Sequence, residues 1–129
     1  MIDKWWLWMA LVLFCASCTE DEGDNNSCNG VADFVAVWNI SEQCGSNDSQ
    51  YALTVTENSS GGIKLSNLGG LGAGSYVDAT VNGASFTIPP QTVQGLTFSG
   101  NGSLNAGCLQ LTLIWTGSAK GNCSGNGTK

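Results

Sequence analysis

The chain has 129 residues and a net charge of −6, with four lysine or arginine residues in total and no histidine. With so few cations no basic patch can form, so nucleic-acid binding through phosphate neutralisation is not expected. The missing histidine removes the usual base near neutral pH, and with it the serine–histidine and cysteine–histidine arrangements of hydrolases. We therefore expect one small domain that is not an enzyme and needs no cofactor.

The first 17 residues are typical of an export signal, which we expect to be helical. Lys4 precedes an apolar run from Trp5 to Ala16. This run is shorter than the about 20 residues that span a bilayer, and it suits the hydrophobic region of a signal peptide. Ala16 and Ser17 are the small residues that a signal peptidase needs beside its cut. An ordinary cleaved signal, followed by a coincidental cysteine, is the alternative interpretation.

Cys18 ends the apolar run, and an acidic stretch follows it. Ala16-Ser17-Cys18 resembles the lipobox of bacterial lipoproteins, in which two small residues precede the lipidated cysteine. Cys15 stands where leucine is usual. The acidic run Glu20-Asp21-Glu22 is similar to that of Bacteroidetes lipoproteins exported to the outer face of the outer membrane. The resemblance implies a lipid anchor on Cys18 and a cell-surface location on the outer membrane.

Residues 18–30 form the expected tether between this anchor and a β-domain over residues 31–129. They are acidic and polar and cannot bury an apolar surface, so we expect a flexible spacer. Their acids lack the spacing of an EF-hand, so a calcium loop is not expected.

From residue 31 the apolar residues recur with a period of two, which is typical of half-buried antiparallel strands. No stretch after residue 30 has a helical period of useful length. In the first predicted strand one face carries Phe34, Ala36, Trp38 and Ile40. Further strands are predicted at residues 51–55, 63–65, 77–81, 85–88, 96–99 and 109–115.

Glycine and proline predict the connections. Asn82-Gly83 and Asn101-Gly102 are expected to form tight hairpin turns, the second leading to a short strand around Leu104, because Asn-Gly tolerates the positive φ of a type I′ turn. Gly69–Gly74 is too rich in glycine for a regular strand and predicts a bend. Pro89-Pro90 is expected to end a strand.

The order of short strands predicts the fold class. It favours an all-β domain, either a small antiparallel up-and-down β-barrel of about eight strands or a two-sheet β-sandwich. Closure into a barrel removes the edge strands that invite aggregation. Because sequential hairpins need no long crossover, we favour the barrel.

Three segments carry a second resemblance. Val37–Cys44, which contains Trp38, and the stretches Ala84–Val93 and Leu96–Gly102 are similar to a family of small Bacteroidetes lipoproteins of uncharacterised function. In that family a tryptophan opens the first strand, and an Ile-Pro-x-Gln segment precedes a Thr-Phe-Ser-Gly hairpin. The family is loosely lipocalin-like, which implies a barrel. Ala36 stands where the Gly-x-Trp motif of true lipocalins has its glycine.

Two of the six cysteines belong to the signal and the lipobox, which leaves four. An even number in an exported chain predicts two disulfides. We expect no metal, because no C-x-x-C pair follows residue 18 and no histidine can assist. The first and last strands of an up-and-down barrel are neighbours, which favours Cys44–Cys123 with Cys28–Cys108. The local pairing, Cys28–Cys44 with Cys108–Cys123, stays open.

Aromatic residues on the predicted inward faces are the first candidates for a ligand site. We expect them to form the core that so small a domain needs. A barrel cavity that holds a small apolar ligand is the alternative. The residues concerned are Trp38, Tyr51, Phe86, Phe98 and Trp115.

Polar candidates are few. Asp33 and Glu42 flank the first predicted strand and could meet as a carboxylate pair, although solvated surface acids are the favoured interpretation. Tyr76 is predicted on the opposite, outer face and could belong to a glycan-binding surface. Three functions therefore stay open: a lipid-anchored, non-enzymatic binding or accessory module, which we favour, a lipocalin-like carrier of a small hydrophobic ligand, and a hydrolase or inhibitor that uses exposed acids.

Overall fold

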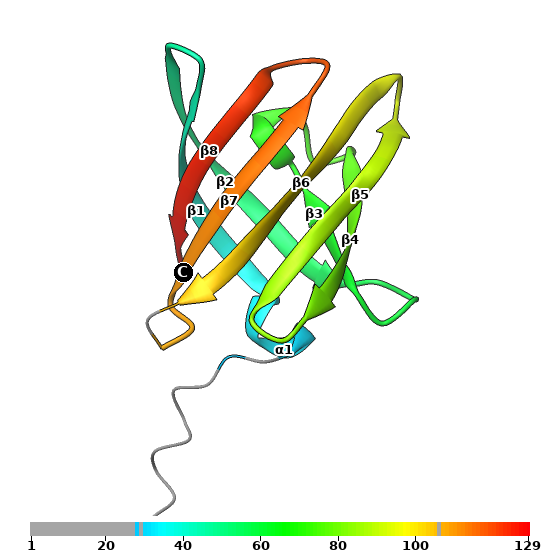
Figure 1. Cartoon of the computed structure of the whole chain (residues 1–129), viewed down its shortest axis with the longest axis vertical. Helices are drawn as coiled ribbons and strands as arrows, with labels where there is room; N and C mark the ends of the chain where they lie inside the picture. Colours follow the sequence, from blue (N-terminus) through cyan, green and yellow to red (C-terminus); the bar gives the residue numbers. More distant parts are fainter. Residues whose placement is uncertain (1–27, 29, 106) are drawn as a thin grey trace, which may run out of the picture.

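The computed structural model describes residue 28, residues 30–105 and residues 107–129. Eight consecutive antiparallel strands close into a barrel in which β8 pairs with both β7 and β1 (Figure 1). The predicted up-and-down barrel is thereby confirmed, and the sandwich alternative is wrong. The predicted signal peptide, Cys18 and most of the tether lie outside the described residues. The strands are β1 (Ala36–Cys44), β2 (Asn47–Glu57), β3 (Ile63–Ser66), β4 (Tyr76–Asn82), β5 (Ser85–Val93), β6 (Leu96–Asn105), β7 (Gln110–Gly117) and β8 (Gly121–Thr128).

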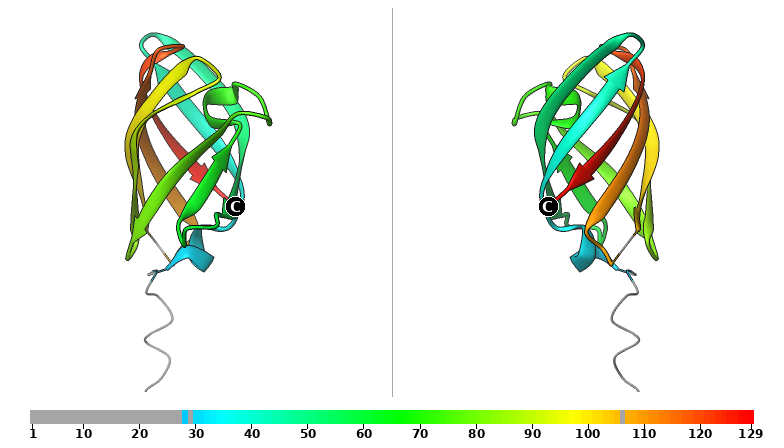
Figure 2. Two further views of the ribbon diagram at one scale, coloured as in Figure 1. Left: turned by 90° about the vertical axis from the view of Figure 1, so that its right-hand side faces the viewer. Right: turned by 90° about the vertical axis from the view of Figure 1, so that its left-hand side faces the viewer.

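The barrel has two distinct ends (Figure 2). One end carries the short helix α1 (Val31–Phe34) and the β4–β5 and β6–β7 turns, and we call it the α1 end. The other carries the 3₁₀ turn η3 (Leu68–Gly70) and the β1–β2 and β7–β8 turns, and we call it the η3 end. In the part of the chain that the structure describes, no helix is long and apolar enough to cross a membrane.

Helix α1 corrects the expectation that Phe34 begins the first strand and that no helix follows residue 30. A single turn is too short to produce a helical period in the sequence. Phe34 is fully buried, and its ring meets that of Phe86 edge-on with centroids 5.4 Å apart. The Trp38 indole donates a hydrogen bond of 2.9 Å to the Phe34 carbonyl. Phe34 therefore closes the α1 end of the core.

One of the two Asn-Gly pairs lies at a turn and the other lies inside a strand. A tight turn joins β4 to β5 at the predicted place, but its central residues are Gly83, at a φ of 65°, and Ala84, while Asn82 ends β4 and pairs with Ser85. The predicted turn at Asn101-Gly102 is wrong, because both residues lie inside the continuous strand β6 and pair with β7. Gly102 faces inward, where a Cβ atom would overlap the Phe86 ring. Gly102 therefore lets the β6 backbone lie close to the core and does not form a turn.

The structure tests three other local predictions, which concern Pro89-Pro90, Gly69–Gly74 and Leu109. Strand β5 continues through Pro89-Pro90, where its register with β6 shifts, so the prolines mark a bulge and not a strand end. The predicted bend at Gly69–Gly74 is present and contains part of η3. Leu109, predicted to face inward, precedes β7 and is exposed.

A disulfide ties the chain together at each end of the barrel. Cys28–Cys108 lies at the α1 end and Cys44–Cys123 at the η3 end, which is the pairing favoured from the sequence. Cys44 and Cys123 are register partners across the β1–β8 seam that closes the barrel. Each bridge encloses a loop of about 80 residues, which corresponds to about 4 kcal/mol in the loop-entropy model.

Candidate functional site

The predicted aromatic residues fill the barrel. Trp38, Phe86, Phe98 and Trp115 are all buried. Phe98 stacks on Trp115 with ring centroids 5.7 Å apart, and side chains can fill the interior of a barrel of this size. These rings occupy the space that the carrier hypothesis assigned to a ligand. Tyr51, the fifth member of the set, is partly buried and belongs to a polar cluster at the η3 end.

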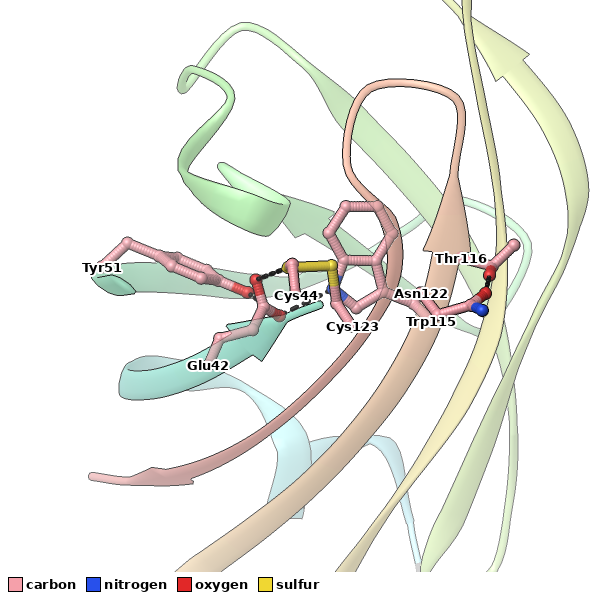
Figure 3. The surroundings of a disulfide bond; sticks show 7 residues. All are labelled: Glu42, Cys44, Tyr51, Trp115, Thr116, Asn122 and Cys123. Carbon is pink, nitrogen blue, oxygen red and sulfur yellow. Dashed lines mark hydrogen bonds between the residues drawn. A yellow bond between two sulfur atoms is a disulfide. The ribbon is translucent and has the colours of Figure 1, made fainter. Parts of the chain in front are cut away.

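Glu42 is the centre of that cluster, and the expectation that it is a solvated surface acid is wrong. Its side chain faces the barrel interior from β1 and is only 4 % exposed. The Trp115 indole donates a hydrogen bond of 2.6 Å to Glu42 Oε2, and the Tyr51 hydroxyl donates one of 2.9 Å to the same oxygen (Figure 3). The period-two signal could have found this residue, because Glu42 continues the inward parity of Trp38 and Ile40.

The second carboxylate oxygen of Glu42 faces the disulfide. Cys44 Sγ lies 3.6 Å from Glu42 Oε1, a contact that Figure 3 also draws. Because this sulfur belongs to the Cys44–Cys123 bridge, it carries no hydrogen and cannot donate. Among the described residues, Oε1 thus has no hydrogen-bond donor and Glu42 has no cationic partner.

Tyr51 and η3 enclose the cluster. Burial, and secondarily the charge of Glu42, raise the pKa of the Tyr51 hydroxyl well above its usual value. Gly70 lies against the Tyr51 side chain, and Gly69 lies so close to Trp115 that a Cβ atom would come within 2.7 Å of the indole ring. The absence of a side chain at Gly69 lets η3 lie directly against Trp115, and Gly70 lies beside Tyr51, so η3 packs on two of the residues that bind Glu42.

Asp33 and Glu42 do not form the predicted carboxylate pair. Asp33 lies in α1, before the start of β1, and Glu42 lies near the other end of that strand. About 20 Å of extended strand separates Ala36 from Glu42. At the α1 end, Lys129 Nζ donates to the Asp33 carbonyl and lies 4.8 Å from the centre of the Trp38 ring.

The outer wall of the barrel is hollowed over β7, β8, β1 and β2. We call this hollow, of about 810 Å³, the seam groove. Within the described part of the chain, its lining includes one charged residue besides the inward-facing Glu42, namely Asp48, and Ile114 supplies an exposed apolar side chain. The remaining outward side chains are amides and hydroxyls: Ser41, Gln43, Gln50, Thr112, Ser124 and Asn126.

Glycines on β8 explain why the wall is drawn inward at the seam groove. Gly125 and Gly127 face the interior, where they carry no side chain. A Cβ atom at Gly127 would come within 2.6 Å of Ile40 Cδ1, so the backbone lies directly against the core. Gly102 on β6 has the same relation to Phe86, and a second, smaller hollow lies over β5, β6 and β7.

Tyr76 lies on the outer wall, as predicted, and is 48 % exposed. It belongs to β4, which is across the barrel from β8 in the strand order. Lys64 Nζ lies 4.7 Å from the centre of its ring. Tyr76 therefore forms a separate surface feature and does not contribute to the seam groove.

Comparison with known proteins defines the fold class. No family model and no curated protein matches the chain. The solved structure of a redesigned β-barrel is similar, with a TM-score of 0.57 and 14 % sequence identity over 79 % of this chain and 96 % of that one. At this identity the similarity concerns the fold alone. The protein is a small eight-stranded antiparallel β-barrel.

Proposed function

We propose that the protein is a lipid-anchored, non-enzymatic surface module of the outer membrane, and that it recognises its ligand on the outer wall of the barrel. One observation carries the location of the site: side chains fill the interior, whereas the seam groove is open to solvent. The filled core weighs against the alternative of a lipocalin-like carrier. The absence of histidine and the separation of Asp33 from Glu42 support a non-enzymatic role.

The chemistry of the seam groove favours a neutral, hydroxyl-rich ligand such as an oligosaccharide. Amide and hydroxyl side chains both donate and accept hydrogen bonds, which suits sugar hydroxyl groups. Among the described residues, no lysine or arginine lines the groove, so an anionic ligand would meet no counter-charge there. Ile114 offers an apolar contact for the C–H face of a sugar ring.

The anchoring part of the proposal relies on the lipobox Ala16-Ser17-Cys18 and the acidic residues that follow it. Cys28 is tied to Cys108, so a tether that ends at residue 28 joins the barrel at its α1 end. The η3 end would then face away from the membrane, with the seam groove on the side of the barrel. This orientation leaves the groove accessible to extracellular glycans.

Calorimetric titration of the full chain with a panel of neutral oligosaccharides tests the binding site. Gln43 and Asn126 present their amides on neighbouring strands of the groove. Replacing both, in Gln43→Ala with Asn126→Ala, should weaken binding about tenfold or more, since each lost hydrogen bond contributes about 1 kcal/mol.

The matched control is Thr56→Ala, an exposed position on β2 that does not line the groove. It should leave the affinity unchanged. If no neutral saccharide binds, or if Thr56→Ala weakens binding as much as the double variant, the seam groove is not the site.

A further inference from the structure

The Glu42 carboxyl group is buried in the barrel, and no cationic group among the described residues contacts it. Its Oε2 atom has two neutral donors, Trp115 and Tyr51, while Oε1 faces a sulfur atom that cannot donate. A buried carboxylate that lacks a charged partner is destabilising. An apolar residue at this position would pack the core at least as well. The buried carboxyl group therefore suggests that the barrel binds a ligand here.

The atoms around Oε1 show what kind of partner fits. A carboxylate oxygen of Glu42 and the sulfurs of Cys44 and Cys123 all lie within 4.8 Å of one another, and all three residues are buried. Two thiolates with one carboxylate form a ligand set that suits zinc and other thiophilic divalent cations. In the disulfide neither sulfur can serve, since the metal ligand is the thiolate.

We propose that reduction of Cys44–Cys123 turns this cluster into a binding site for a thiophilic divalent cation such as Zn²⁺, with Cys44, Cys123 and Glu42 as its protein ligands. A dithiol reductant supplies two electrons: the protein S–S bond breaks, two protein thiols form, and the reductant becomes a disulfide. Binding of the ion then releases the two thiol protons to solvent. The divalent ion then offsets two of the three negative charges that the two thiolates and Glu42 carry.

Two features of the barrel prepare the site. The indole N–H of Trp115 and the hydroxyl of Tyr51 hold Oε2, so that the carboxylate is oriented with Oε1 toward the sulfurs. Such outer hydrogen bonds fix metal ligands in many proteins. Cys44 and Cys123 also face each other across paired strands, so the β1–β8 backbone ladder keeps them together after the S–S bond has broken.

A route to the site exists at the η3 end. A hollow of about 220 Å³ at the barrel rim is lined by Cys44, Asn47, Ser49, Ala119 and Lys120. The hollow borders Cys44, one of the three proposed ligand residues, and is large enough for a water molecule. Three protein ligands with one water complete the tetrahedral coordination that Zn²⁺ prefers.

Cobalt spectroscopy of the full chain tests the site, since Co²⁺ replaces Zn²⁺ and reports its ligands. The protein is reduced, freed of reductant without air and titrated with Co²⁺. With the reduced protein we expect sulfur-to-cobalt charge-transfer bands and the visible bands of tetrahedral Co²⁺ at one equivalent. Addition of Zn²⁺ should remove both sets of bands. The oxidised protein should show neither set. The variant Glu42→Gln should weaken binding about tenfold or more.

Two variants separate this site from other thiols and acids. The double variant Cys44→Ser with Cys123→Ser keeps Cys28 and Cys108, and it should lose the bands. Glu57→Gln removes an exposed acid of β2 and should bind as the unaltered chain does. Circular dichroism accompanies each titration.

Several outcomes would overturn the proposal. These are a folded, reduced chain without the bands, an unchanged affinity in Glu42→Gln, and bands that persist in the double cysteine variant. A chain that unfolds on reduction and does not refold with Zn²⁺ would also overturn it.

Discussion

Tyr51 shows how strongly the interior of the barrel changes a single side chain. Its hydroxyl donates to Glu42 in a largely buried site, and burial followed by the carboxylate charge raises its pKa. In the unfolded chain the same hydroxyl ionises near its usual pKa of about 10. The folded barrel therefore retains a proton that the unfolded chain loses at alkaline pH.

This difference predicts how stability depends on pH. The contribution of Tyr51 to the free energy of unfolding is complete below pH about 10. Above that pH it falls by about 1.4 kcal/mol per pH unit, because the Tyr51 hydroxyl ionises in the unfolded chain. Tyr51→Phe should cost about 1–3 kcal/mol at neutral pH, because Glu42 loses a donor. The difference between the two chains in free energy of unfolding should then shrink above pH 10.

Urea unfolding at neutral and alkaline pH measures the effect, with the half-exposed Tyr76→Phe as the matched control. Tyr76→Phe removes a hydroxyl on the outer wall, away from Glu42, so it should not reproduce the change seen in Tyr51→Phe. A stability difference between Tyr51→Phe and the unaltered chain that stays constant across this pH range would contradict the assignment.

At the scale of the element, β6 shows why local chemistry did not decide the path of the chain. Asn101-Gly102 has the composition of a hairpin turn, yet the strand continues because Gly102 must leave room for the Phe86 ring. The same residue type thus serves a turn at Gly83 and a close contact at Gly102. Gly83 has a positive φ and open space around it, whereas at Gly102 a Cβ atom would meet the Phe86 ring of β5 and the Thr112 carbonyl of β7.

Adding a methyl group at this contact should destabilise the barrel. Gly102→Ala is expected to lower the free energy of unfolding by about 1–3 kcal/mol through overpacking, measured by urea denaturation. Gly74→Ala is the control, since a Cβ atom there has no neighbour within 4 Å and its φ is not in the left-handed region.

A second substitution tests the cause. Phe86→Leu combined with Gly102→Ala should cost less than the sum of the two single changes, because the smaller side chain makes room for the methyl group. Additive costs would show that contact with the ring is not the reason for glycine.

At the scale of the whole molecule, the proposed anchor determines where the barrel works. Cys18→Ser removes the sulfur that would carry lipid, so the protein should move from the membrane fraction to the soluble fraction of its host. Immunoblotting of the two fractions measures the change, with Ser27→Ala as a tether substitution that leaves the lipobox intact. If Cys18→Ser still fractionates with membranes, the protein is held there by something other than this cysteine.

Much of the barrel could be predicted from the sequence by itself. Alternation of large apolar residues with serine and threonine sets the inward face of most strands, and consecutive hairpins bring the first segment of the barrel beside the last. This order favoured the Cys44–Cys123 bridge, which the structure confirms. Strand β8 itself is not among the predicted strands, because its inward positions Gly125 and Gly127 carry no apolar side chain. Alternation is a local property, which is why a sequence can reveal it.

The tertiary structure decided what depends on distant strands. The period-two pattern of β1 could have predicted that Glu42 faces inward. Its hydrogen-bond donor Trp115, however, comes from β7, 73 residues further along the chain, and only barrel closure brings the two together. In the same way, the inward positions of β6 and β8 require glycine because rings and aliphatic groups on other strands occupy the space of a Cβ atom. Side-chain contacts across a closed sheet are set by packing in three dimensions, and no local pattern encodes them.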